Sequence, residues 1–202
     1  MDDTRKPSEE HAKRLKEAMC IMDRGVKHWS EAEAILQGIL SECPEYPEAK
    51  FQLARLWTGD MRNSCYIGIT STNEVRTHSS EDVHHTVERL LQDVIQSVPN
   101  HPGPYYCFAC WACFFPLKKS YSDMKKYYME ALSRDDSGDP LYYIFHEDVA
   151  EAASEENDRA LALEAFYRTH KTGKEDGRTR PGDEPAYTYW KEARVRWQRE
   201  GH

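Results

Sequence analysis

The chain has 202 residues, of which 39% are hydrophobic and 31% are charged, so it has room for one domain or at most two small ones. Its formal net charge is −8 and its Lys and Arg residues form no basic stripe, which argues against nucleic-acid binding and favours a basic peptide or protein face as the partner. The first stretch, MDDTRKPSEEHAKR, has no apolar run. We therefore expect no signal peptide, no membrane contact and reduced cysteines in the cytoplasm, with the nucleus left open.

Hydrophobic residues recur with a helical period in every long segment, which predicts an all-α chain. Ser30 and Glu33 have the spacing of a capping box, and Pro47 suits the first position of a helix. The predicted helices cover, in order, residues 9–26, 30–42, 47–57, 80–98, 104–115, 121–134, 141–153, 158–170 and 186–199.

Two segments read as loops between or after these helices. Residues 59–79 form an inserted loop with one short β-branched stretch at 65–71, and they could serve recognition or be a passive insertion. Residues 171–185 contain no apolar side chain and predict a flexible loop. Residues 186–202 would then supply a C-terminal capping helix.

An internal repeat organises the chain. Residues 41–57 and 96–112 share one frame, in which a proline, two residues and a second proline precede an apolar helix. Residues 134–148 keep this frame, with Asp136 in place of the first proline. A large–small pair, Leu53-Ala54, falls on Phe108-Ala109 and then on Phe145-His146.

The segments YSDMKKYYMEALSRDD and PEAKFQLARLW resemble the second and first helices of the tetratricopeptide repeat. The resemblance implies a right-handed α-solenoid of about four helix pairs over residues 1–170. It also implies a scaffold or adaptor that binds another protein. His146 stands where the family has a small residue. This departure from the family pattern argues against tight packing of the fourth pair.

The resemblance further implies that the first helix of each pair lines a concave groove. Three aromatics then share one register position, and the residues one turn further on complete a partner-binding surface. These positions are Phe51, Tyr106 and Tyr143, followed by Arg55, Cys110 and Glu147. Lys and Asn do not occupy the family's clamp positions, so we do not expect a carboxylate clamp for chaperone tails. The alternative is that neighbouring helices bury the aromatics.

Cys107, Cys110 and Cys113 lie three apart in a very apolar helix. We interpret them as packing residues and expect neither a metal nor another cofactor, because the spacing turns Cys107 and Cys113 away from each other. His84 and His85 are adjacent on a helix and point in different directions, so we interpret them as solvated.

No nucleotide-binding or nucleophile motif is present, and the carboxylates fit a charged helical surface, so we expect no enzyme. Two alternatives to an adaptor remain. The chain could assemble with copies of itself through exposed Tyr and Trp, or it could be an enzyme on a helical frame.

Overall fold

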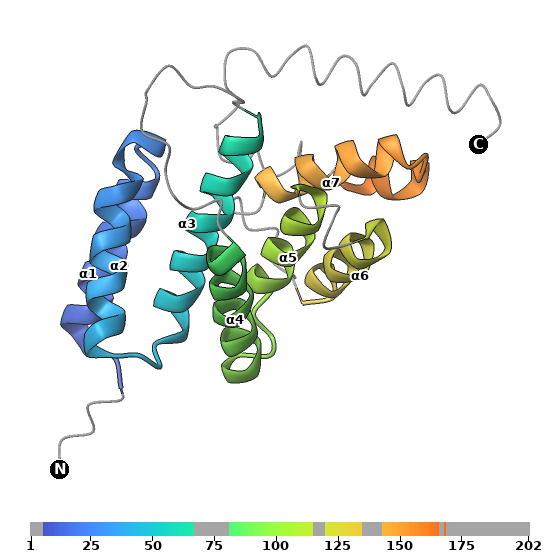
Figure 1. The fold of residues 1–202 in the computed structure, drawn as a ribbon. Coiled ribbons are helices and arrows are strands. Elements are labelled where there is room, and N and C mark those ends of the chain that lie inside the picture. Colours follow the sequence, from blue (N-terminus) through green and yellow to red (C-terminus); the bar gives the residue numbers. More distant parts are fainter. Residues whose placement is uncertain (1–5, 67–80, 115–119, 135–142, 166–167, 169–202) are drawn as a thin grey trace.

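The computed structural model describes residues 6–66, 81–114, 120–134, 143–165 and 168 (Figure 1). Every element among these residues is a helix, which confirms the all-α class. The elements in chain order are α1 (Glu9–Met22), the 3-10 helix η1 (Val26–His28), α2 (Trp29–Glu42), α3 (Pro47–Tyr66), α4 (Glu81–Ser97), α5 (Gly103–Phe114), α6 (Tyr121–Leu132) and α7 (Tyr143–Glu155). Residues 159–165 and 168 are also helical.

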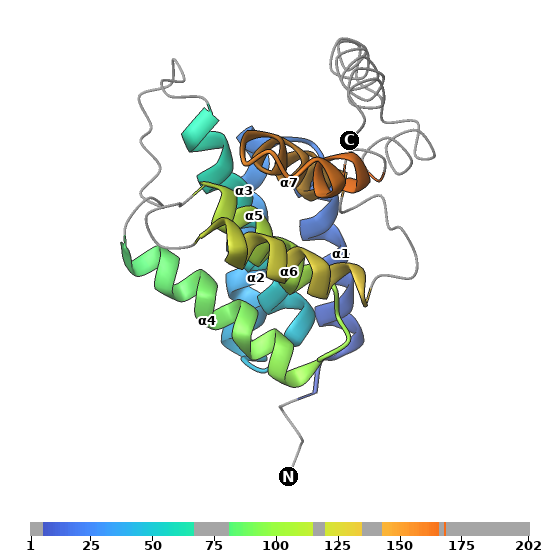
Figure 2. The ribbon, with the colours of Figure 1, turned by 90° about the vertical axis from the view of Figure 1, so that its right-hand side faces the viewer.

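Helices that follow each other along the chain pack as pairs. The helices α1 and α2, α3 and α4, and α5 and α6 are in contact, and so are α2 with α3, α4 with α5, and α6 with α7. In addition, α5 touches both α3 and α7. Figure 2 shows α4 and α6 in front of α3 and α5. Thus α3 and α5 are inner helices, and α4 and α6 lie on the outside.

The start of α2 differs from the prediction. The helix begins at Trp29, and its N-cap His28 makes no side-chain capping bond. Because η1 leads directly into α2, Ser30 already lies inside the first turn and cannot act as the cap. The capping boxes that the described residues do form are Ser8 with His11 and Ser120 with Asp123.

Helix α3 is longer than predicted. It continues to Tyr66, so residues 59–66 are helical and not part of a loop, and the first two residues of the β-branched stretch at 65–71 belong to the helix. Gly59 lies under an indole ring, since an added Cβ there would be 2.9 Å from Cη2 of Trp29. Residues 67–79, the predicted loop at 171–185 and the predicted helix at 186–202 lie outside the described residues.

His146 fits the core in spite of its size. Its side chain is buried, and its Nδ1 is 2.9 Å from the hydroxyl of Tyr128. Its ring meets Tyr106 edge-on at a centroid distance of 5.2 Å. His146 therefore fills a position that the repeat frame assigns to a small residue. One polar partner and two aromatic neighbours accommodate its ring there.

Candidate functional site

The predicted aromatic surface is not open where the structure describes it. Phe51 is 1% exposed and Tyr106 is 0% exposed. Gly103 permits this burial, because a Cβ there would be only 2.3 Å from Cζ of Phe51. Tyr106 stacks on Phe145 at a centroid distance of 6.1 Å. The prediction that these two aromatics line a groove is therefore wrong, and the buried alternative holds for them.

Burial also removes Cys110 from the predicted surface. Cys110 is 0% exposed, and its Sγ donates to Oδ2 of the buried Asp148 at 3.1 Å. The side chains of Tyr143 and Glu147, both in α7, lie outside the described residues. Only Arg55 of the predicted partner-binding set is seen to be partly accessible.

The cysteines of α5 pack as small apolar residues. Cys107 is 0% exposed, and burial raises its pKa to about 12, against the smaller lowering effects of Arg55 and a hydrogen bond with Thr58. It is therefore a thiol at neutral pH. No group of three or more potential metal ligands occurs among the described residues. The side chain of Cys113 is not among them, and the absence of bound metal stays a prediction.

His84 is not solvated as predicted. It is 6% exposed, and its Nδ1 accepts the indole hydrogen of Trp111 at 3.0 Å. The two rings stack with centroids 5.9 Å apart. His85, the next residue, is exposed as expected. The pairing joins α4 to α5 across the second and third helix pairs, which a local sequence pattern does not reveal.

A polar line runs along α3, and we call it the α3 polar line: Glu48, Gln52 and Arg55. Glu48 and Arg55 are partly exposed, whereas Gln52 and the other residues from Ala49 to Thr58 are buried. Gln52 Nε2 donates to Oε1 of Glu48 at 2.7 Å, and Arg55 donates to Oε1 of Gln52 at 2.9 Å. Gln52 is itself buried, so its amide holds the two partly exposed charged residues in fixed positions.

Glu48 stays ionised in this line. Burial tends to raise its pKa, but hydrogen bonds from His101 and Gln52 outweigh burial and leave the pKa below its ordinary value. The nearby charge of Arg55 acts in the same direction. The line therefore presents a carboxylate at one end and a guanidinium at the other. Its spacing of four and then three residues, which places side chains on one face of a helix, was visible in the sequence.

A lysine on the flank of this helix is structural. The side chain of Lys50 is 9% exposed, and its Nζ lies 2.9 Å from Asp93 of α4 and 3.2 Å from Glu45. Burial lowers the pKa of Lys50, but the hydrogen bonds to Asp93 and Glu45 raise it to a net value above the ordinary one. Lys50 thus holds α3 against α4 and is not available to a partner.

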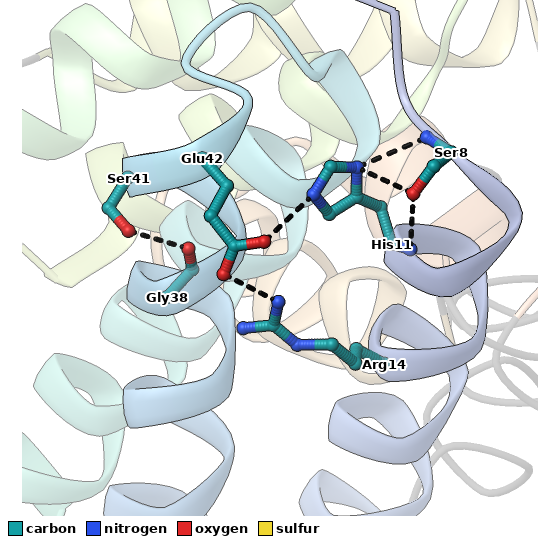
Figure 3. Close-up of polar contacts among 6 residues, drawn as sticks. All are labelled: Ser8, His11, Arg14, Gly38, Ser41 and Glu42. Atoms are coloured by element: carbon teal, nitrogen blue, oxygen red, sulfur yellow. Dashed lines mark hydrogen bonds and ion pairs between the residues drawn. The ribbon is translucent and has the colours of Figure 1, made fainter. Parts of the chain in front are cut away.

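A serine, a histidine and a glutamate meet where the start of α1 lies beside the end of α2 (Figure 3). His11 Nε2 is 3.2 Å from Oε2 of Glu42, and its Nδ1 is 3.1 Å from both N and Oγ of Ser8. The Ser8 N–H donates into Nδ1, and Ser8 Oγ accepts from the His11 N–H at 3.2 Å. The ring nitrogen that would have to activate the hydroxyl is already engaged, so this cluster is a helix cap.

No family model, curated protein or solved structure matches this chain. The resemblance to the tetratricopeptide repeat therefore depends on the residues of this chain alone. In the described part of the chain, no helix combines the length and apolarity needed to cross a membrane.

Proposed function

We propose that the chain is a helical-repeat scaffold of the tetratricopeptide type that binds another protein. The single observation that carries the proposal is the α3 polar line. Within the otherwise buried stretch from Ala49 to Thr58, Arg55 is partly exposed, and Gln52 links it to the partly exposed Glu48 one turn earlier. Charged groups ordered before binding lose less conformational freedom when a partner docks, which favours recognition.

The arrangement of the helices supports the same proposal. Consecutive pairs touch in chain order, and the first helices of the pairs contact one another, as stacked repeats require. A stack of helix pairs offers an extended surface to partners and requires no reactive groups of its own. The net charge of −8 favours a partner face that is basic overall, with an acidic or accepting group opposite Arg55.

The test is capture of partners by two charge-reversal variants of the full chain. Arg55→Glu reverses the guanidinium of the α3 polar line, and Arg89→Glu is the matched control on an exposed position of α4. We expect proteins that co-purify with the native chain from its own cells to be lost with Arg55→Glu and kept with Arg89→Glu. The loss should correspond to about 1–4 kcal/mol, the range for an interface hot spot.

Circular dichroism of both variants checks that they are folded. If Arg55→Glu is folded and retains the same partners with the same affinity as the native chain, the α3 polar line is not the binding surface. If the native chain instead forms a tight oligomer by light scattering and captures nothing else, self-assembly replaces the adaptor as the function.

A further inference from the structure

His101 sits where three helices converge. It immediately precedes Pro102 and α5, and its ring lies 4.6 Å from that of Phe51 in α3. Arg134, two residues beyond the end of α6, donates to the carbonyl of Pro99, two residues before His101. The side chain is 17% exposed. It is therefore part of the interface between α3 and α5, yet water can still reach it.

The hydrogen bonds of the ring assign its protonation. Gly103 N–H donates to Nδ1 at 3.0 Å, so Nδ1 carries the lone pair. The proton of the neutral ring is then on Nε2, which lies 3.3 Å from Oε2 of Glu48. The neutral imidazole thus accepts from the first residue of α5 and donates to the first turn of α3. It joins two inner helices through one side chain.

A protonated ring cannot keep both bonds. Imidazolium carries a hydrogen on each nitrogen, so the Nδ1 hydrogen would face the Gly103 N–H, and the helix end would lose its acceptor. The Gly103 N–H is one of the amides that have no partner inside the helix, and a positive charge at a helix N-terminus is also unfavourable. On the other side, the carboxylate of Glu48 favours the imidazolium.

The charged groups around the ring offer no other acceptor to the Gly103 N–H when the ring is protonated. Glu48 is the group at hydrogen-bond distance, and Arg55 lies further along the same face of α3 and acts on Glu48. Arg134, two residues beyond the end of α6, donates to the Pro99 carbonyl and to Glu130. Both arginines are donors only, and the Glu48 carboxylate already accepts from Gln52 and faces Nε2 of His101, so none of these groups replaces Nδ1 as the acceptor of the Gly103 N–H.

The same arrangement occurs a second time. His11 accepts the Ser8 N–H at Nδ1 and directs Nε2 at Glu42 of α2, at 3.2 Å. In both places a histidine near a helix start uses one nitrogen for a backbone amide and the other for a glutamate on another helix. The two differ in position, since His11 lies within α1 and His101 precedes α5, but each ring joins a helix start to a second helix.

We propose that His101 is a proton-sensitive helix cap. While the imidazole is neutral it holds the first turn of α5 against α3, and protonation releases that turn. The device is independent of the partner-binding function proposed above, although Glu48 belongs to both. Histidine side chains as a class titrate around pH 6.5, so the tests compare the chain above and below that pH.

The first test reads the ring directly. Long-range ¹H–¹⁵N correlation of the native chain at about pH 7.5 should show His101 as the Nε2–H tautomer with a bare Nδ1. The second test measures how fast the Gly103 amide exchanges with water, relative to an unstructured peptide at the same pH. Its protection should fall about tenfold between about pH 7.5 and 5.5, the effect expected for loss of a helix cap. A Nδ1–H tautomer, or constant protection, would overturn the proposal.

Three variants separate the cap from general acid sensitivity. His101→Asn supplies an oxygen that can accept the amide two residues on but does not titrate, so protection should be independent of pH. His101→Ala has no acceptor, so protection should be low at both pH values. His85→Asn, on the exposed face of α4, should behave like the native chain. An unchanged acid response in His101→Asn, or its loss in His85→Asn, would contradict the proposal.

Discussion

Helices α5 and α6 form one hairpin and have 12 residues each, yet they meet solvent in opposite ways. In α5, every described residue from Gly103 to Ala112 is buried. In α6, only Met124, Tyr128 and Ala131 are buried, while Met129 is 51% exposed. A helix that is apolar all round belongs inside a fold, and an amphipathic one belongs at its surface. The inner helix α5 therefore stabilises the fold. Contacts with partners are left to the outer helices and to exposed polar residues such as those of the α3 polar line.

The largest expected effect comes from truncating an aromatic residue in the inner helix. Tyr106→Ala in α5 should cost about 3–5 kcal/mol of unfolding free energy, because it removes a ring packed among Tyr128, Phe145 and His146. Met129→Ala on the exposed face of α6 should change it by less than about 0.5 kcal/mol. Urea unfolding measures both. If the Tyr106 variant is as stable as the Met129 variant, α5 is not the central helix that the structure shows.

A second comparison uses two glycines, one in α5 and one in α2. Gly103→Ala in α5 would place a Cβ 2.3 Å from Cζ of Phe51 and should cost about 3 kcal/mol, the upper end for overpacking. Gly38→Ala in α2 meets only the flexible end of Arg14, at 2.7 Å, and should stabilise the helix by up to about 1 kcal/mol. Thermal unfolding should move in opposite directions for the two variants. A Gly103→Ala variant as stable as the native chain would mean that Phe51 can move aside and that α3 and α5 are loosely packed.

The third prediction concerns the polar contact between α4 and α5. Trp111→Phe removes the donor to Nδ1 of the buried His84 and should cost about 2 kcal/mol. Replacing both residues with apolar ones, as His84→Leu with Trp111→Phe, should recover part of that loss, because no buried acceptor is left behind. The control is Tyr127→Phe in α6, which keeps the ring stacked on Phe108 and should change the unfolding free energy by less than about 0.5 kcal/mol. Strict additivity of the two single changes would show that His84 and Trp111 do not interact.

Local patterns in the sequence predicted the positions of most helices. The end of α2 at Glu42, the start of α3 at Pro47 and the start of α6 at Tyr121 agree with the structure, because proline and the hydrophobic period are properties of short segments. The burial of Cys107 and Cys110 also followed from the apolar composition of their helix.

The errors arise where distant helices decide the outcome. Phe51 was assigned to an open face because its register matched a groove, but α5 approaches closely over Gly103 and covers it. His84 finds a partner in Trp111, which is 27 residues away. Neither contact is encoded in the residues next to it. The sequence prediction included Arg55 but not Glu48 and Gln52, because it defined the surface by the register of the aromatic residues.

The smallest expected effect concerns the N-terminal caps of α2 and α6. It tests the predicted Ser30 cap, which the structure does not show. Ser120 caps α6, since its Oγ accepts from the Asp123 N–H at 3.2 Å while Asp123 Oδ2 accepts from the Ser120 N–H at 2.9 Å. Ser120→Ala should therefore cost about 1 kcal/mol of unfolding free energy.

Ser30 is exposed within the first turn of α2 and makes no capping bond, so Ser30→Ala should change the unfolding free energy by less than about 0.5 kcal/mol. Both variants change one serine at the start of a helix, and urea unfolding compares them directly. A loss of about 1 kcal/mol for Ser30→Ala would instead favour the capping box with Glu33 that the spacing suggested. The Glu33 carboxylate would then have to turn toward the Ser30 N–H and away from the indole of Trp57, whose Nε1 donates to it at 3.0 Å.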